Sequence, residues 1–350
     1  MFFNTNITYS TLAIMSNGKK SFSNMGQIIE RSGDTIARLL RPSEESFACC
    51  HALSIQLLSS SKVLYLSIDD TLLRKIYSRF MQGAGYFYDT KIGRNVMAYR
   101  LVAGLLSNDK YGVPIGADYI YPREILDQIK EKFPSKIDIA KALVEEAIRL
   151  FPKMRIIVLA DGLFASVEFL RWCKNMQMPL EVRMHSNRVV IYKGEKITLQ
   201  QLIKKFGPKG RQSARTVTVS WHDIQLEVTI VKRTNNHGEE TIVFQAATYK
   251  SLPIKHVKNY KKRWPIEMVI RTSKQHLGLQ DCYSCSLKKQ RNHTAAVLLA
   301  YGITQFEMKR CKLKIPEDAV RRLKKQTVES VIARINASVQ NFQSSVRDYA

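Results

Sequence analysis

Three acidic residues stand where their carboxylates could take part in chemistry. Asp69 and Asp161 each end an apolar run that is typical of a buried strand, and Glu267 lies in a strongly basic helical segment. Acids at the carboxyl edge of an α/β sheet lie where sites usually form. For any one of them, a helix cap or a loop acid is the simpler explanation. We prefer Asp69 to Asp70 because strand alternation places Asp70 on the apolar face.

The segment from Tyr260 to Lys274 has the most informative spacing. At about 100° per residue, Tyr260, Arg263, Glu267 and Lys274 would fall within an arc of about 60° on a continuous helix. One helix face would then carry a phenol, a guanidinium, a carboxylate and an ammonium group. If the helix begins at Pro265 instead, only Glu267 and Lys274 share that face. A solvated charged face is the alternative to a functional one.

The charge balance indicates a polyanionic partner. The 350 residues include 55 Lys and Arg against 30 Asp and Glu, a formal net charge of +25. Between Lys250 and Lys314 there are fifteen basic and three acidic residues. Such an excess favours nucleic acid or an acidic membrane surface as the partner. An acid embedded there is best explained by a metal ion held beside a phosphate.

Composition excludes several classes of protein. Hydrophobic residues make up 45% of the chain, which excludes wholesale disorder. The first residues lack the basic start of a signal peptide and no apolar run reaches about 18 residues, so we expect neither a signal peptide nor a membrane span. The pair Cys282 and Cys285 has no second pair at zinc-site spacing, which favours reduced thiols in a cytoplasmic protein.

The elements that must position the three acids suggest a mixed α/β domain. Strands are expected at 63–69, 86–91, 99–107, 113–119 and 155–160, and helices at 123–132, 137–150 and 163–173. Strands followed by a helix–strand–helix alternation imply a mixed sheet. A β-rich stretch follows, with strands at 216–221, 224–232 and 241–247 and a turn at 235–238. The chain then becomes helical, at 260–277, 290–310 and 317–342.

Both ends of the chain leave alternatives open. Short helices at 23–31 and 34–40, joined at Gly33, form a helix-turn-helix pattern that would leave Arg38 and Arg41 free to face DNA. An ordinary helical pair with a basic face explains the pattern equally well. The apolar residues of 317–342 have near-helical spacing, which fits a dimer helix or, slightly better, packing on the chain's own core.

The segment from Tyr260 to Lys274 resembles the signature of a known family. The spacing Tyr-x2-Arg-x3-Glu-x6-Lys is similar to the signature of bacterial insertion-sequence DDE transposases of the Tyr-Arg-Glu-Lys type. The resemblance extends to Asp69-Asp-Thr71, to Ala160-Asp161-Gly162 and to the Leu277-Gly-Leu step. Spacing agrees as well, since 92 residues separate Asp69 from Asp161 and 106 separate Asp161 from Glu267.

The resemblance implies an RNase H-like catalytic core interrupted by a β insertion. Asp69, Asp161 and Glu267 would hold two Mg²⁺ or Mn²⁺ ions, with Asp69 bridging them. Two such ions can neutralise charge on the entering and leaving oxygens of a phosphodiester. The implied activity is metal-dependent cleavage at the transposon ends, followed by strand transfer to target DNA.

The resemblance also implies residues that bind DNA. Tyr260, Arg263 and Lys274 look like the family residues that grip phosphates at the transposon end. Trp221, in the insertion, could stack on a flipped base, although a Trp that ends an alternating strand more often belongs to the core. The expected regions are a helical region at 1–60, the core at 61–186 and 251–312, the insertion at 187–250 and a helical region at 313–350.

We therefore expect a cytoplasmic, nucleoid-associated DNA transposase that acts on terminal inverted repeats and target DNA. It would be a homodimer when assembled on DNA and would have no membrane partner. The alternative is an inactive, transposase-derived DNA-binding protein, which would have no need for all three acids. A structure-specific nuclease of the same fold would lack the Tyr-Arg-Glu-Lys helix.

Overall fold

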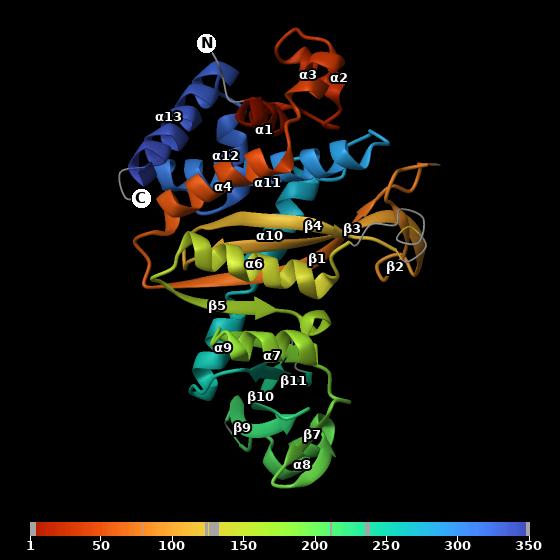
Figure 1. Cartoon of the computed structure of the whole chain (residues 1–350), viewed down its shortest axis with the longest axis vertical. Coiled ribbons are helices and arrows are strands. Elements are labelled where there is room, and N and C mark those ends of the chain that lie inside the picture. The colour runs from red at the N-terminus through yellow and green to blue at the C-terminus, as the bar shows by residue number, and fades with distance from the viewer. Residues whose placement is uncertain are drawn as a thin grey trace.

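The computed structural model describes residues 5–78, 80–122, 125, 133–210, 212–234 and 239–347, with side chains up to residue 340. The helix expected at 123–132 lies outside these residues apart from residue 125, as do the turn at 235–238 and the side chain of Phe342. Figure 1 shows helices with both termini at one end, the main sheet in the middle and the β-rich region at the other end.

The strands of the described residues form one mixed sheet of eleven strands. The first six are β1 (Val63–Arg74), β2 (Gly85–Asp89), β3 (Arg94–Ser107), β4 (Gly112–Ile120), β5 (Arg155–Ala160) and β6 (Leu180–Met184). The remaining five are β7 (Val189–Tyr192), β8 (Glu195–Thr198), β9 (Ala214–Trp221), β10 (Ile224–Thr234) and β11 (Glu240–Ala247). Their order is β2-β3-β1-β5-β6-β11-β10-β9-β7-β8, with β4 paired to β3. The expected mixed α/β architecture with helical flanks is confirmed.

Two crossover helices make the centre of the sheet parallel. Helix α6 (Lys136–Leu150) connects to β5, which pairs parallel with β1, and α7 (Val167–Asn175) connects to β6, which pairs parallel with β5. Ser135 and Asp138 form a capping box that starts α6. A Cβ atom on Gly104 or Gly116 would come within 2.8 Å of Leu143, so both glycines let α6 approach the sheet closely.

Strand β1 differs from expectation at its carboxyl end. It does not stop at Asp69 but continues for five residues to Arg74, paired with β3 throughout. Its pairing with β5 ends at Ile68 and Ala160, because β5 itself ends there. Asp69 therefore lies where the parallel ladder stops, although its own strand continues.

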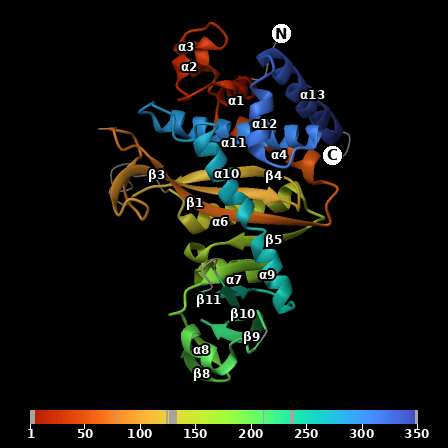
Figure 2. The ribbon, with the colours of Figure 1, turned by 180° about the vertical axis from the view of Figure 1, so that it is seen from behind.

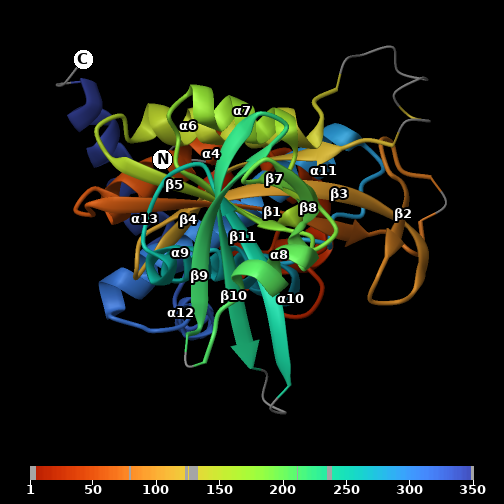
Figure 3. The same cartoon turned by 90° about the horizontal axis from the view of Figure 1, so that it is seen from below.

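Opposite faces of the sheet carry different helices. Helices α6 and α7 cover the face seen in Figure 1, and α9 (Pro253–Lys261) and α10 (Trp264–Gln275) cross the opposite face, seen in Figure 2. The β-rich region is joined to the main sheet by β11, which pairs antiparallel with β6. Figure 3 shows β9, β10 and β11 from below. The strands of this region thus extend the main sheet.

The helices at both ends of the chain pack together. They are α1 (Thr5–Met15), α2 (Phe22–Gln27), α3 (Gly33–Leu39), α4 (Ser43–Leu58), α11 (Leu287–Cys311), α12 (Pro316–Leu323) and α13 (Val328–Arg347). Helix α11 is buried along most of its length, between α1, α4 and β4. No helix in the described part of the chain is long and apolar enough to span a membrane.

The helix expected at 317–342 is two helices. It breaks after α12, and Thr327 starts α13 by accepting a hydrogen bond from the Ser330 amide at 3.3 Å. Its apolar side chains, including Leu323, Val331 and Ile335, are buried in the chain's own core. This burial favours internal packing over a dimer helix.

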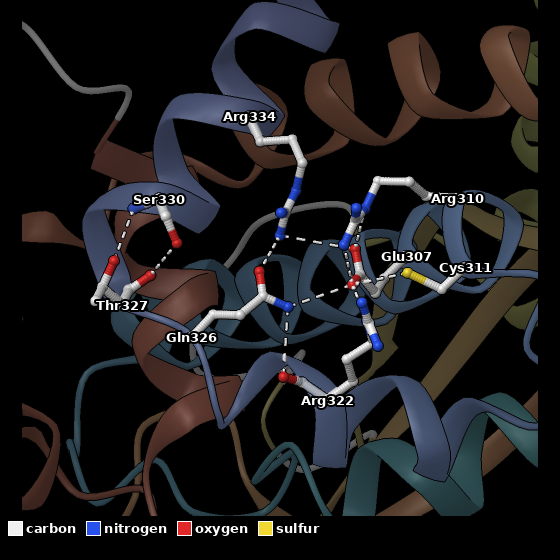
Figure 4. Close-up of polar contacts among 8 residues, drawn as sticks. All are labelled: Glu307, Arg310, Cys311, Arg322, Gln326, Thr327, Ser330 and Arg334. Atoms are coloured by element: carbon white, nitrogen blue, oxygen red, sulfur yellow. Dashed lines mark hydrogen bonds and ion pairs between the residues drawn. The ribbon is translucent and has the colours of Figure 1, made fainter.

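Glu307 joins the three C-terminal helices (Figure 4). Its side chain is 1% exposed and accepts hydrogen bonds from Arg310 at 2.6 and 2.8 Å, and Arg322 and Arg334 lie 3.3 and 3.7 Å from its carboxylate. Burial acts to raise the pKa of Glu307, but these cations and hydrogen bonds outweigh it and lower the pKa to about 2. The ionised carboxylate therefore stabilises the packing of α11, α12 and α13.

We expect Glu307→Gln to destabilise the protein by about 3 kcal/mol at neutral pH, because three cations lose their counter-charge. The folded pKa lies below the ordinary value of 4.5, so this stabilisation is present above pH 4.5 and is lost as the pH falls toward 2. Denaturant unfolding from pH 7 to pH 2 would measure both effects. The exposed Glu329→Gln is the control; an equal loss in both variants would contradict the assignment.

Candidate active site

Asp69 and Asp161 are brought together by the parallel pairing of β1 and β5. Ile68 on β1 pairs with Ala160 on β5, and the residue that follows each of them is one of the two acids. The carboxyl ends of parallel strands lie at the same sheet edge. Two residues that are 92 apart in sequence therefore become neighbours at the edge where the ladder ends.

Asp69 is a largely buried acid, with its side chain 15% exposed. Its Oδ1 accepts a hydrogen bond from the Asp70 amide at 2.9 Å, and its Oδ2 lies 2.9 Å from Nη1 of Arg263. Burial raises the pKa of Asp69 to about 6; Arg263 opposes the shift, and the nearby Asp161 adds to it. The surroundings of Asp69 therefore bring its pKa closer to neutral pH than that of an exposed aspartate.

Asp161 starts the short 3₁₀ helix Gly162–Phe164. Its Oδ1 accepts a hydrogen bond from the Leu163 amide at 2.8 Å. Burial raises the pKa of Asp161, while this hydrogen bond lowers it. The side chain of Asp161 thus caps this short helix and also lies beside Asp69.

Asp70 lies in a different environment from Asp69. Its carboxylate is ion-paired with Arg100 on the neighbouring strand β3 and is 8% exposed. Alternation along β1 directs its side chain to the opposite face from that of Asp69. Each acid has a cation as its partner, Arg263 for Asp69 and Arg100 for Asp70. Besides burial, Asp70 also raises the pKa of Asp161, so the preference for Asp69 stays a prediction.

The helix expected at 260–277 is divided between α9 and α10. Pro265 lacks an amide hydrogen and its ring conflicts with the carbonyl four residues earlier, so the α-helix cannot continue through it. Instead the Lys262 and Arg263 amides bond to Asn259 and Tyr260, at 2.8 and 3.1 Å, in a tight turn. Of the two alternatives that the sequence leaves open, the structure favours a helix that begins beside the proline, with Tyr260 and Arg263 before it and Glu267 and Lys274 within it.

Arg263 connects two of the predicted acids. Nη1 of its guanidinium contacts Asp69, and Nη2 is hydrogen-bonded to Glu267 one helical turn later. Its side chain is 16% exposed. The sequence suggested that Arg263 contacts phosphate; in the structure it lies between the carboxylates of Asp69 and Glu267 and partly neutralises them.

Tyr260 and Lys274 also contact the strands. Tyr260 is 8% exposed and its hydroxyl donates a hydrogen bond to the Ala160 carbonyl at 3.2 Å, directly before Asp161. Burial raises the pKa of Tyr260 to about 12. Lys274 donates to Oγ1 of Thr71 at 2.7 Å and to the Leu72 carbonyl at 2.8 Å. Burial lowers the pKa of Lys274 to about 8.

A buried polar cluster holds α9 against the sheet, and no sequence pattern predicted it. Glu181 on β6 is 1% exposed, and Oε1 accepts hydrogen bonds from Tyr249 at 2.5 Å and Asn259 at 3.2 Å. Nδ1 of His256 lies 2.9 Å from the same oxygen. The helix that leads to Arg263 is thereby attached to the strand next to β5.

A groove of about 960 Å³ opens between the end of β5, strands β6 and β11, and the turn between α9 and α10. Its charged lining consists of Asp161, Arg183, Arg233, Lys261, Arg263 and Glu267. Asp69 adjoins it through Arg263. Arg183 and Arg233 were missed from the sequence, because each lies in a strand that also carries other charged residues and neither arginine stands out. The groove is a basic channel with acids at one end.

Trp221 and the N-terminal arginines lie away from this cluster of acids. Trp221 is 5% exposed, with the guanidinium of Arg188 at 5.6 Å from its ring centre. The burial of the indole favours core packing, the alternative that the sequence also offers, over base stacking. Arg38 and Arg41 are exposed at the end of α3, which Figure 1 shows in the helical part of the molecule.

The three predicted acids are suited to a hard divalent cation, since carboxylate oxygens are the ligands that Mg²⁺ and Mn²⁺ prefer. The buried Asp69 also has a raised pKa, which a nearby cation would lower. Among the described residues, no group of three His, Cys, Asp or Glu is already arranged as a metal site. Arg263 accounts for this, because it separates Glu267 from Asp69.

In metal-free protein, we expect the carboxyl carbon of Asp69 to titrate near pH 6 by NMR. The folded pKa exceeds the ordinary value of 3.8, so ionisation of Asp69 costs stability as the pH rises from 3.8 to about 6. Arg263→Gln should raise this pKa by about 1–3 pH units, because the favourable cation is lost. Arg263→Lys, which keeps the charge, is the control. A pKa near 3.8 in the wild-type protein would refute this electrostatic description.

Comparison with known proteins identifies the domain. No curated protein matches the sequence. Residues 131–303 match a protein-family model described as "Transposase DDE domain". The match includes Asp161, Glu267 and the α9–α10 turn, whereas Asp69 precedes it and is connected to it by the β1–β5 ladder. The chain therefore carries a transposase DDE domain, and its large mixed sheet with helical flanks is consistent with an RNase H-like fold.

Proposed function

We propose that the chain is an active DNA transposase of the Tyr-Arg-Glu-Lys type, which cleaves phosphodiesters at the ends of its element and joins them to target DNA. One observation carries the proposal. Asp69 and Asp161 are neighbours at the sheet edge, and Arg263 links Asp69 to Glu267 at the end of a basic groove.

In this proposal Asp69, Asp161 and Glu267 hold two Mg²⁺ or Mn²⁺ ions. When bound, the ions would activate water and neutralise charge on the phosphate. The protein itself contributes the position of the acids. The β1–β5 ladder fixes two of them, and the attachment of α9 to Glu181 orients the helix that carries the third.

The cations of the site act on the DNA backbone. Arg263 has a planar fork of donors that suits a phosphate as well as a carboxylate. Lys274 supplies a point charge next to the strand that carries Asp69. Tyr260 is buried against Ala160, so its contribution is to position the end of β5. Arg183 and Arg233 extend the basic surface along the groove.

The proposed partners follow from the chemistry of the chain. DNA is the substrate, as terminal repeats and as target, and α2 and α3 with Arg38 and Arg41 would contact the repeats. Two copies would assemble on DNA because transposition joins two ends.

Glu267→Gln tests the catalytic assignment. The wild-type protein, with Mg²⁺ and a duplex that carries the DNA flanking its own gene, should nick at one discrete position. The variant should nick at least about a hundredfold more slowly while its DNA affinity is retained, because only a ligand charge is lost. Glu168→Gln, an exposed glutamate on α7, is the control. Equal nicking by Glu267→Gln would refute the assignment. Tight binding by the wild-type protein without nicking would indicate the alternative, an inactive, transposase-derived DNA-binding protein.

Lys274→Ala tests the contact with phosphate. Removing one ammonium that contacts DNA should weaken binding to end DNA and lower the salt dependence of log K by about 0.9. Lys312→Ala, at the end of α11, removes an equal charge elsewhere and is the control. Unchanged affinity and salt dependence in Lys274→Ala would restrict Lys274 to its contacts with Thr71 and Leu72.

A further inference from the structure

An arm with exposed aromatic side chains projects from the sheet next to the candidate site. We call residues 76–94 the aromatic arm; residue 79 lies outside the described part. Tyr77 is 99% exposed, Phe80 73%, Tyr86 70% and Tyr88 62%. Figures 1 and 3 show that β2, which carries two of them, extends beyond the helices that cover the rest of the sheet. Aromatic rings so exposed on one arm indicate a binding surface.

The root of the arm is held firmly. Lys75, which directly precedes it, is 7% exposed and donates hydrogen bonds to the carbonyls of Gln280 and Cys282 at 2.9 and 2.8 Å. The Gln82 amide bonds to the Cys285 carbonyl at 3.0 Å. The arm is thus attached to the loop between α10 and α11, and the exposure of its rings does not result from an unanchored segment.

Its tip is ordered by a single acid. The carboxylate of Asp89 accepts hydrogen bonds from Arg74 at 2.5 Å and from the Lys91 amide at 2.9 Å, and its carbonyl accepts one from Gly93 at 2.9 Å. Gly93 has a φ of +67°, which favours glycine in this turn. The hairpin that presents Tyr86 and Tyr88 is therefore pre-organised.

The charge of the arm selects a polyanion. Residues 76–94 contain three Lys and Arg against one acid, Asp89. That acid is buried and paired with Arg74, while Lys91 and Arg94 are exposed. Basic side chains interleaved with aromatic rings form the usual surface for single-stranded nucleic acid, in which cations contact the backbone and rings stack on the bases.

Spacing along β2 suits stacking. Tyr86 and Tyr88 lie two residues apart on the exposed face of the strand, a separation of about 6.7 Å at the usual rise of β-strands. This is about twice the stacking distance of bases, so a base can enter between two parallel rings. A protein partner would instead require a continuous apolar surface, and the cations Lys91 and Arg94 interrupt this one.

The arm starts close to the candidate site. Strand β1 continues for five residues beyond Asp69, a distance of about 17 Å, and the arm follows it directly. Lys274 lies along this path, on Thr71 and Leu72. DNA bound at the acids could therefore reach the arm within a few nucleotides.

We propose that the aromatic arm binds unpaired nucleotides of DNA, by stacking bases on Tyr86 and Tyr88 while Lys91 and Arg94 contact the backbone. The inference rests on the proposed function in taking DNA as the ligand. It adds a second contact surface, specific for unpaired bases, to the groove beside the acids.

Binding measured without metal tests this proposal. With the full-length protein in EDTA, fluorescence anisotropy is recorded for labelled oligothymidine and for a blunt duplex. The double variant Tyr86→Ala/Tyr88→Ala should bind oligothymidine about tenfold or more weakly and the duplex within about twofold of wild type. Tyr86→Phe/Tyr88→Phe should bind both like wild type, because stacking is preserved. Val189→Ala/Ile191→Ala, which truncates two exposed apolar residues that lie two positions apart on β7, is the control.

Two results would overturn the proposal. One is unchanged oligothymidine binding by a folded alanine variant, with folding checked by circular dichroism. The other is a change of molar mass in light scattering with unchanged DNA binding, which would assign the arm to contact between copies of this chain. Nicking assays with the wild-type protein and Glu267→Gln separate the two proposals: if the wild type does not nick, or if Glu267→Gln nicks equally well, while arm-dependent binding persists, only the catalytic proposal is wrong. If nicking occurs and the alanine variant binds normally, only the arm proposal is wrong.

Discussion

The structure depends on two carboxylates held side by side at the end of a parallel ladder. Asp69 and Asp161 follow the last pair of β1 and β5, where both are partly removed from water and repel each other. Such an arrangement costs free energy unless positive charge is near. Arg263 supplies it, and the turn before α10 and the attachment of α9 serve to bring this one guanidinium to Asp69.

The same balance of charge recurs among the C-terminal helices, with the opposite excess. At Asp69 and Glu267 one cation is shared by two acids, whereas at Glu307 one acid is shared by three arginines. The pKa values move accordingly, up for Asp69 and down for Glu307. An excess of negative charge suits a site that is to receive cations, and the three arginines suit a fixed joint between helices.

Much of the fold and part of the site could be predicted from local sequence. Apolar runs that end in Asp161 and alternating strands such as β9 and β10 are encoded by neighbouring residues, and they were found where expected. The break before α10 was visible in Pro265 as an open alternative. The bridge from Arg263 to Asp69 could not be predicted, and the burial of Trp221 stayed one of two alternatives, because each depends on residues far away in sequence. The continuation of β1 beyond Asp69 likewise depends on its partner β3.

The ladder between β6 and β11 also has a mechanical consequence. It joins the β-rich region to the main sheet by four residue pairs, from Glu181–Ala247 to Met184–Phe244. These two strands form one wall of the groove. A hinge at this place would have to break backbone hydrogen bonds, so this wall of the groove is held by the sheet. If DNA binds here as proposed, any fit to this wall must come from the shape of the DNA, whose cost of deformation depends on its sequence.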